Sequence, residues 1–407
     1  MKVQPIAKPL SPLHRLWRLF PAGQRRRLFG AMTAALAPRP DRPAPAARTG
    51  IAVVGELSRA SGLGEAARQM RAAFEALGIM TWGIDTETRE VPDIPAGVPL
   101  VFHVNAPMLP YTLLRLPRQL LRGRRVIGYW AWELPRVPDT WRPAFGFVHE
   151  IWALSQFTGD AIRTILPPGT DIKLRVVPIP VAITPPVPSA KTRADFGLPD
   201  NTLIVLTSFN LASSRVRKNP EGAIAAFRRA FGPRPDRLLL LKIGNPSHFP
   251  ADFAALQAAI DGVPNIRLFT ETLPAADAHA LTACADIVLS LHRSEGFGLV
   301  PAEAMLLGVP VIATGWSGNL DFMDADSAAL VAYTLIQARD PRGVFEAPGA
   351  VWADPDIADA AAHLIRLAGN PAARKDLGHR GQLAARARLG LAPVRVAVGA
   401  LGLRVAA

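Results

Sequence analysis

The chain has 407 residues, of which 49% are hydrophobic, and it carries a formal net charge of +13 at pH 7. This length and apolar content predict two globular domains, each with a buried core. The single cysteine, Cys284, excludes an internal disulfide and a cysteine-rich zinc site and fits a reducing compartment. The positive charge predicts an anionic partner, which charge alone leaves open between phosphorylated substrates, acidic lipids and nucleic acid.

Residues 1–49 form a segment rich in arginine, with scattered apolar side chains and a Pro/Ala tether. Two interpretations stay open. The segment either lies on an anionic membrane surface, with Trp17, Leu19 and Phe20 inserted and residues 25–27 at the phosphates, or is a disordered basic tail. Since no uninterrupted apolar run reaches the roughly 18 residues of a membrane span, we expect a cytoplasmic protein, peripheral at most on the inner face of the membrane.

From residue 50 short apolar runs alternate with stretches of helical spacing such as "GEAARQMRAAFEALG". The runs are "GIAVVG", "PLVFHVN", "RRVIGYWAW", "EIWALS" and "LRVVPIP". This alternation predicts a doubly wound parallel sheet, the first domain, over residues 50–185.

The proline-dense stretch "VPIPVAITPPVPSAKT" predicts a linker, because it can continue neither a helix nor a central strand. A second alternating series follows, with the apolar runs "TLIVLTSF", "RLLLLKIG", "NIRLF", "ADIVLSLH", "VPVIATG" and "AALVAY". We therefore expect an α/β protein of two Rossmann-like domains, the second over residues 186–375, followed by a helical segment over 376–407. The ligand is expected in the cleft between them, outside the carboxyl ends of the strands.

The stretch "LHRSEGFGLVPAEAM" sets Glu295 and Glu303 on either side of a glycine-bearing loop that follows an apolar run. Gly296 and Gly298 allow close approach of the backbone to a ligand. Pro301 suits the first turn of a helix whose positive N-terminus faces the cleft and favours phosphate. Taken singly, the two glutamates also fit a solvated loop carboxylate and a simple helix-start residue.

Extended to "SEGFGLVPAEAMLLGVPVIATGWSGNLDFM", the stretch resembles the Glu, seven residues, Glu signature of the retaining glycosyltransferases of family 4, which have the GT-B fold. The resemblance continues in "GYWAWELPRVPDTW", "EIWALSQFTGDAI" and "RVRKNPEGAIAAFRRAF" and covers roughly residues 50–380. It implies that Glu295 contacts hydroxyls of the donor sugar and that Glu303 holds the nucleotide ribose. The backbone amides expected at the sugar and diphosphate are those of Gly296, Phe297, Gly298 and Leu299.

Lys218 in "SSRVRKNP" matches the lysine that this family places on the diphosphate. A fixed cation stabilises the negative charge of the leaving group without a metal ion, so we expect neither a metal nor another cofactor. Arg217 and Arg215 both compete as its arginine partner, and we favour Arg217. The base is expected near Thr270 in "RLFTETLP", through backbone contacts.

Gly62 and Gly64 stand where the chain turns into the first helix of domain one, and the resemblance places this loop against the diphosphate and the acceptor. The same "GLGEAA" also fits a dinucleotide-binding pattern, with Asp85 for the ribose, so an NAD(P)-dependent oxidoreductase is an alternative. We rank it lower, because these glycines come seven residues after Gly55 and because Glu65 would bring negative charge towards a pyrophosphate.

His103, Trp132 and Glu133 end strands at the same cleft and are candidates for binding the acceptor; core packing explains the first two equally well. The resemblance implies transfer of a hexose, with a GDP-hexose such as GDP-mannose favoured, to a glycan or lipid-linked acceptor. The other alternative is a basic protein that binds nucleic acid or a membrane surface. We expect no nucleic-acid partner, because much of the charge sits in residues 1–49 and the C-terminal helix.

Overall fold

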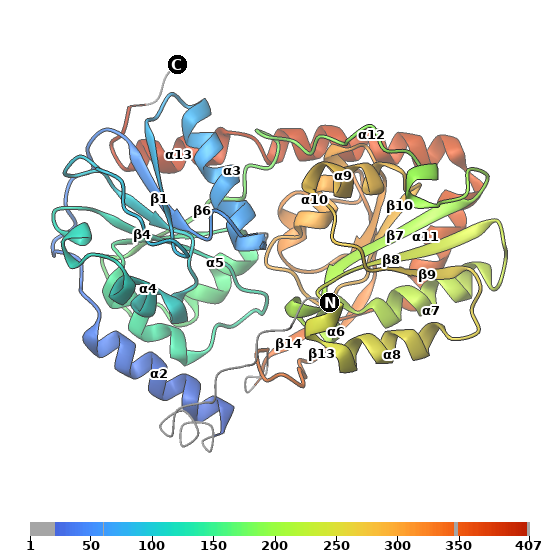
Figure 1. Cartoon of the computed structure of the whole chain (residues 1–407), viewed down its shortest axis with the longest axis horizontal. Helices are drawn as coiled ribbons and strands as arrows, with labels where there is room; N and C mark the ends of the chain where they lie inside the picture. Colours follow the sequence, from blue (N-terminus) through green and yellow to red (C-terminus); the bar gives the residue numbers. More distant parts are fainter. Residues whose placement is uncertain (1–20, 60, 346–348, 405–407) are drawn as a thin grey trace, which may run out of the picture.

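The computed structural model describes residues 21–59, 61–345 and 349–404 of the chain. Two six-stranded sheets form two α/β domains that lie side by side (Figure 1). Every strand pair within these two sheets is parallel. This arrangement confirms the predicted fold class, two Rossmann-like parallel sheets.

The N-terminal sheet has the strand order β2-β1-β3-β4-β5-β6. Its strands are β1 Ile51–Gly55, β2 Thr81–Asp85, β3 Leu100–Phe102, β4 Val126–Trp130, β5 Glu150–Ala153 and β6 Lys173–Val176. The helices α3 Gly62–Ala76, α4 Leu109–Arg115 and α5 Gln156–Arg163 connect them. Residues of β1 alternate between two cores, with Ile51 and Val53 in one and Ala52 and Val54 in the other, so apolar packing covers both faces of the sheet.

The C-terminal sheet has the strand order β12-β11-β10-β7-β8-β9. Its strands are β7 Leu203–Asn210, β8 Arg237–Gly244, β9 Ile266–Phe269, β10 Ile287–Ser290, β11 Val311–Thr314 and β12 Ala329–Val331. Helices α7 Pro220–Phe231, α8 Pro250–Ile260 and α11 Ile357–Gly369 contribute to the core on one face, and α9 Ala275–Ala283, α10 Leu299–Leu306 and α12 Pro371–Arg388 to that on the other. All six apolar runs of the second series are strands.

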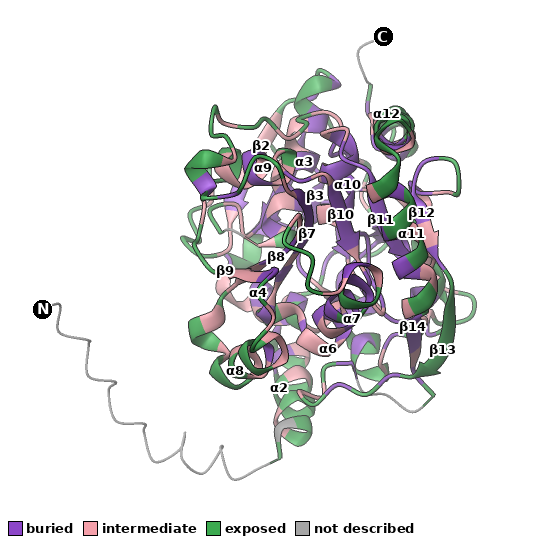
Figure 2. Ribbon diagram, turned by 90° about the vertical axis from the view of Figure 1, so that its right-hand side faces the viewer, coloured by how far each residue is buried: buried purple, intermediate pink, exposed green. Residues whose placement is uncertain are grey.

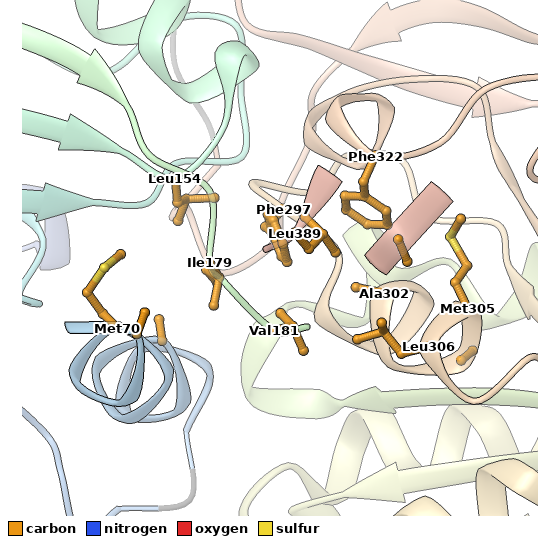
Figure 3. Packing of buried hydrophobic residues seen from close by; sticks show 14 of the residues in the cluster. Met70, Leu154, Ile179, Val181, Phe297, Ala302, Met305, Leu306, Phe322 and Leu389 are labelled. Carbon is orange, nitrogen blue, oxygen red and sulfur yellow. The ribbon is translucent and has the colours of Figure 1, made fainter. Parts of the chain in front are cut away.

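The two domains share one of these cores. Figure 3 shows Ile179 and Val181 of the proline-rich linker lying between Met70 of α3 and Ala302 and Leu306 of α10. After α12 the chain returns towards the N-terminal domain through α13 Ala392–Ala400 (Figure 1), and the amide of Ala182 donates to the carbonyl of Leu389 at 3.1 Å. The first part of the linker, residues 177–183, is therefore packed between the domains, whereas most of residues 184–192 are exposed.

Two elements lie outside the sheets. The helix α2 Ala22–Leu36, within the predicted basic segment, packs on α4 of the N-terminal domain. The strands β13 Tyr333–Gln337 and β14 Val351–Pro355 form an antiparallel hairpin, whose β13 is exposed along its whole length (Figure 2). Trp17, Leu19 and Phe20, predicted to insert into a membrane, lie outside the described residues. Among the helices described, none combines the length and apolar character needed to span a bilayer.

Candidate functional site

Three charged side chains meet at the carboxyl end of the C-terminal sheet: Arg217, Lys218 and Glu295, here called the Glu295 cluster. The loop between β10 and α10 carries Glu295, whose side chain is only 10% exposed. Its carboxylate accepts a hydrogen bond from Nη1 of Arg217 at 3.1 Å and another from Nζ of Lys218. The structure thus joins the predicted sugar-binding carboxylate to both predicted diphosphate cations.

Backbone contacts fix this arrangement. Arg217 and Lys218 end a single helical turn, α6 Arg215–Lys218, which precedes α7. Asn219 follows it in the left-handed region, with φ of 50°, and donates from Nδ2 to the carbonyl of Leu291 at 2.9 Å. The amide of Arg293 donates to the carbonyl of Arg217 at 2.8 Å. These bonds hold α6 against the loop after β10, although the two segments are far apart in the sequence.

Of the two competing arginines, Arg217 is the one that reaches the cluster. Arg215 instead pairs with Glu221 and, at 3.2 Å, with Asp252. Arg217 is 3% exposed and also donates to the carbonyl of Ser294 at 2.7 Å. Its guanidinium is therefore held at the site by both a charge and a backbone acceptor.

The electrostatics of the cluster favour full ionisation. Burial acts to raise the pKa of Glu295, but Lys218 and Arg217 outweigh it and lower that pKa to about 2. Burial lowers the pKa of Lys218, an effect that Glu295 opposes. With Glu295 charged, Lys218 and Arg217 face its carboxylate, and Arg217 also lies 3.7 Å from Oε1 of Glu133. Cations fixed in this way can stabilise an anionic ligand.

Glu303 lies in α10 in a different environment. Its carboxylate has no hydrogen bond or ion pair with any residue that the structure describes. Burial is the main cause that raises its pKa to about 7, Glu65 adds to the increase, and Lys242 acts against it. Because Glu65 belongs to α3, Glu303 faces the N-terminal domain across the interface.

The predicted glycine loop of the N-terminal domain faces the start of α10. A Cβ atom added at Gly62 would lie 3.8 Å from Cδ1 of Leu299, so these two predicted donor-binding residues approach each other from opposite domains. A Cβ atom at Gly64 would lie 2.5 Å from the carbonyl oxygen of Glu56. Gly64 therefore has a packing role, because any side chain would collide with the backbone of its own loop.

The loop between the two glutamates contacts the other domain directly. A Cβ atom at Gly296 would lie 3.1 Å from the carbonyl oxygen of Trp132. Phe297 is 4% exposed and packs on Phe322 with ring centroids 5.1 Å apart, so only its backbone is free for a ligand. Gly298 has a φ of 102°, which L side chains rarely adopt, and Leu299 starts α10. Thr270, the predicted base contact, is exposed directly after β9.

Trp132 and Glu133, the acceptor candidates after β4, line a pocket of about 270 Å³ between the domains. Arg217 and Phe345 contribute to its wall from the C-terminal domain. Trp132 is 6% exposed, and its ring lies 5.6 Å from that of Phe345. Glu133 is 25% exposed, with Oε1 3.7 Å from Nη2 of Arg217. Of the pair, Glu133 is therefore the more accessible to a ligand.

His103, the third acceptor candidate, follows β3 and is 1% exposed. Its ring stacks on Tyr129 with centroids 4.3 Å apart, and neither ring nitrogen has a hydrogen-bond partner among the described residues. Burial lowers the pKa of His103 to about 3. The imidazole is therefore neutral near pH 7 and lies beneath the surface of the N-terminal domain.

Two features of the site were missed in the sequence. Lys242 interrupts the apolar run near the carboxyl end of β8, and a charge within a buried strand was the available signal. Residues 338–345, in the β13–β14 connection, reach the pocket through Phe345, and Asp340 anchors them by accepting from Oγ of Ser214 at 3.0 Å. Over the described ranges, His, Cys, Asp and Glu side chains form no group of three arranged for a metal ion.

Residues 206–354, most of the C-terminal domain, match the family model described as Glycosyl transferases group 1, in agreement with the resemblance to glycosyltransferases seen in the sequence. The chain has the GT-B fold of solved glycosyltransferases. It superposes on HepE of Anabaena in complex with UDP and glucose at a TM-score of 0.60 and 14% identity, over 87% of this chain and 99% of that one. Sucrose-phosphate synthase of Thermosynechococcus elongatus gives a TM-score of 0.61 at 17% identity, over 87% and 98%.

Curated relatives agree with this family. A D-inositol 3-phosphate glycosyltransferase of Jonesia denitrificans is 31% identical over 183 residues, 42% of this chain and 39% of the relative. A GDP-mannose-dependent alpha-(1-6)-phosphatidylinositol monomannoside mannosyltransferase of Mycolicibacterium smegmatis is 30% identical over 208 residues, 49% and 50% of the two chains. The chain spans about two fifths to one half of the length of these relatives.

Proposed function

We propose that this protein is a retaining glycosyltransferase that moves a hexose from a nucleotide diphosphate sugar to a hydroxyl group of an acceptor. The observation that carries the proposal is the Glu295 cluster, a buried carboxylate held by two cations in the loop that leads to α10, whose Leu299 faces the glycine loop of the other domain. The match to the glycosyltransferase family model supports it, because the matched residues 206–354 contain all three members of the cluster.

The cluster suits the chemistry of breaking a sugar-phosphate bond. Lys218 and Arg217 stabilise the negative charge that develops on the departing diphosphate. Glu295 keeps the two cations in place and presents its carboxylate to donor sugar hydroxyls. The departing phosphate oxygen takes the proton of the attacking hydroxyl on the same face of the sugar, so the anomeric configuration is retained.

Transfer is proposed to need no metal ion, because Lys218, Arg217 and the N-terminus of α10 already supply positive charge at the diphosphate. Turnover that persists at full rate in excess EDTA supports this. Loss of turnover in EDTA that added Mg²⁺ or Mn²⁺ restores contradicts it.

The acceptor is proposed to be a glycan or a lipid-linked polyol that enters the pocket beside Glu133. Relatives named as phosphatidylinositol monomannoside mannosyltransferases motivate the lipid-linked alternative. An ionised Glu133 accepts hydrogen bonds from hydroxyl groups, and the pocket also borders Arg217 of the cluster. An acceptor hydroxyl bound there lies next to the reacting centre.

We also propose that α2 contacts an anionic membrane. Leu28, Met32 and Leu36 share one face of the helix and are 44%, 58% and 61% exposed. Arg26 and Arg27 are exposed at its start, and the helix contains no acidic residue. Exposed apolar side chains next to arginines fit the boundary between anionic headgroups and acyl chains.

The experiment for the enzymatic proposal is a transfer assay with a panel of nucleotide sugars, starting with GDP-mannose because two relatives are named as GDP-mannose-dependent mannosyltransferases. Release of nucleoside diphosphate that depends on an acceptor, with retained configuration in the product by NMR, supports the proposal. A protein that binds no nucleoside diphosphate and turns over none of the sugars contradicts it.

The membrane proposal is tested by sedimentation with vesicles of phosphatidylcholine, with and without phosphatidylserine. The wild type should sediment only with the anionic vesicles, and the L28S/M32S/L36S variant should stay in the supernatant. The matched control is I365S/V396S, which replaces exposed apolar residues of α11 and α13. Equal sedimentation of all three proteins contradicts a role for α2.

The dinucleotide alternative receives no support from the site. Asp85, its ribose candidate, accepts hydrogen bonds from the amides of Ser58 and Glu87, both at 2.7 Å. Its carboxylate is therefore engaged by its own loop.

A further inference from the structure

Lys242 projects from the carboxyl end of β8 on the face that α9 and α10 cover. Leu238 and Leu240 of the same strand belong to the core shared with these helices, whereas Leu239 and Leu241 belong to the core on the opposite face. Side chains alternate along a strand, so Lys242 shares the face of Leu240. Ser208, its register partner on β7, continues the same alternation.

Three polar side chains share this face: Ser208, Lys242 and Glu303, here called the Glu303 face. No hydrogen bond or ion pair of these three side chains is found within the described part of the chain. All three are partly buried, and burial lowers the pKa of Lys242 while Glu303 raises it. Partly buried charges normally find a partner. A cation and a carboxylate that affect each other's pKa without forming an ion pair are each still able to bind a polar ligand.

The strand order indicates which part of a nucleotide sugar would lie at the Glu303 face. Across the sheet, β10 leads to Glu295, β7 to Lys218, β8 to Lys242 and β9 to Thr270. Under the proposed function, sugar and diphosphate occupy the first two positions, so the nucleoside extends over the next two. The ammonium group of lysine only donates hydrogen bonds. Its partner is therefore an acceptor atom of the ribose or of the base, an oxygen or an unprotonated ring nitrogen.

We propose that Lys242 is a donor-binding residue that holds the nucleoside of the sugar donor together with Glu303. The inference rests on the proposed function and assigns to Lys242 the nucleoside, while Lys218 and Arg217 hold the diphosphate. Removing the ammonium group should therefore weaken binding of a nucleoside diphosphate without weakening binding of inorganic pyrophosphate, which has no nucleoside.

The test is calorimetric titration of the full chain with GDP, UDP and inorganic pyrophosphate. In K242M, affinity for the nucleoside diphosphate that the wild type binds best should fall on the order of ten- to hundredfold, as expected for a lost charge-assisted hydrogen bond. Affinity for pyrophosphate should be unchanged. K218M should weaken both ligands, and K173M, at an exposed lysine that starts β6, should weaken neither.

Unchanged nucleoside diphosphate binding in K242M overturns the inference, and so does an equal loss of both ligands. K242R should keep more affinity than K242M, because it restores a positive donor. Thermal melting of each variant shows whether it is folded before titration. A wild type that binds pyrophosphate but no nucleoside diphosphate, with ADP, CDP and dTDP tried after GDP and UDP, contradicts the proposed function itself, an outcome distinct from normal binding in K242M.

Discussion

The Glu295 cluster and the Glu303 face lie at the carboxyl end of the same sheet but differ in how their charges are satisfied. Glu295 accepts hydrogen bonds from two cations and has its pKa lowered to about 2. Glu303, eight positions further on, has no partner among the described residues and has its pKa raised to about 7, chiefly by burial. In the free protein the charges of the Glu295 cluster are paired with one another, whereas those of the Glu303 face are not.

Under the proposed function, this difference corresponds to two tasks of a donor site. Charge that must stabilise a leaving group is most effective when it is already in place, because no reorganisation is then needed during the reaction. Groups that recognise hydroxyls and bases can remain unpaired until the ligand supplies the partner. We therefore expect changes in the Glu295 cluster to affect rate and stability, and changes in the Glu303 face to affect donor affinity.

The largest effect is expected for K218M, which removes the positive charge nearest to Glu295. The turnover number should fall on the order of 100- to 1000-fold, the usual cost of losing one fixed donor to a developing negative charge. Steady-state assays with the best donor measure it, and K173M serves as the matched lysine control. If K218M turns over at the wild-type rate, the cluster does not stabilise the leaving group.

E295Q should mainly reduce stability. It removes the nearer of the two carboxylates that face the almost fully buried Arg217, leaving only Glu133 at 3.7 Å, and breaking a buried pair costs about 3 kcal/mol in the free energy of unfolding. The pKa of Glu295 is lowered from its ordinary value of 4.5 to about 2, so its contribution is present above pH 4.5 and is lost as pH falls towards 2. Urea unfolding at neutral and acidic pH should show this loss in the wild type and a flatter response in E295Q.

E303Q should change the pH dependence of donor binding. The pKa of about 7 leaves Glu303 largely protonated at about pH 6, whereas binding of ribose hydroxyls favours the carboxylate. Wild-type affinity for the nucleoside diphosphate should therefore be about tenfold weaker at pH 6 than at pH 8. E303Q should bind more weakly than the wild type at pH 8 and show no such slope. The same slope in E303Q would assign the titration to another group.

Local sequence patterns predicted the main strands and the charged loop, because each depends on short stretches. The runs "TLIVLTSF" and "ADIVLSLH" are strands, and Glu295 follows the second of them as expected. The choice between Arg215 and Arg217 was harder, since it depends on how α6 meets the loop after β10. The bonds from Asn219 to Leu291 and from Arg293 to Arg217 hold α6 so that Arg217 contacts Glu295 and Arg215 does not.

Other features left no clear local pattern. All five residues of β13 are exposed, so its apolar side chains do not alternate with polar ones as in a half-buried strand. Lys242 was overlooked because one lysine in an apolar run does not reveal which core its face belongs to. Gly64 was predicted to bind the donor, which stays a prediction, and its lack of a side chain has a second reason in the carbonyl oxygen of Glu56 in the same loop, a contact that the sequence pattern does not reveal.

The smallest effect is expected for E133Q, on the N-terminal side of the pocket. Glu133 is a quarter exposed, and its ion pair with Arg217 is long, at 3.7 Å. The change should therefore leave the free energy of unfolding within about 0.5 kcal/mol of the wild type. If the acceptor binds there, its KM should rise several-fold while the KM of the donor stays unchanged. D139N, on a neighbouring carboxylate that is 81% exposed, is the matched control. A rise in the KM of the donor alone would show that the acceptor does not bind beside Glu133. It would indicate instead that Glu133 positions Arg217 for donor binding.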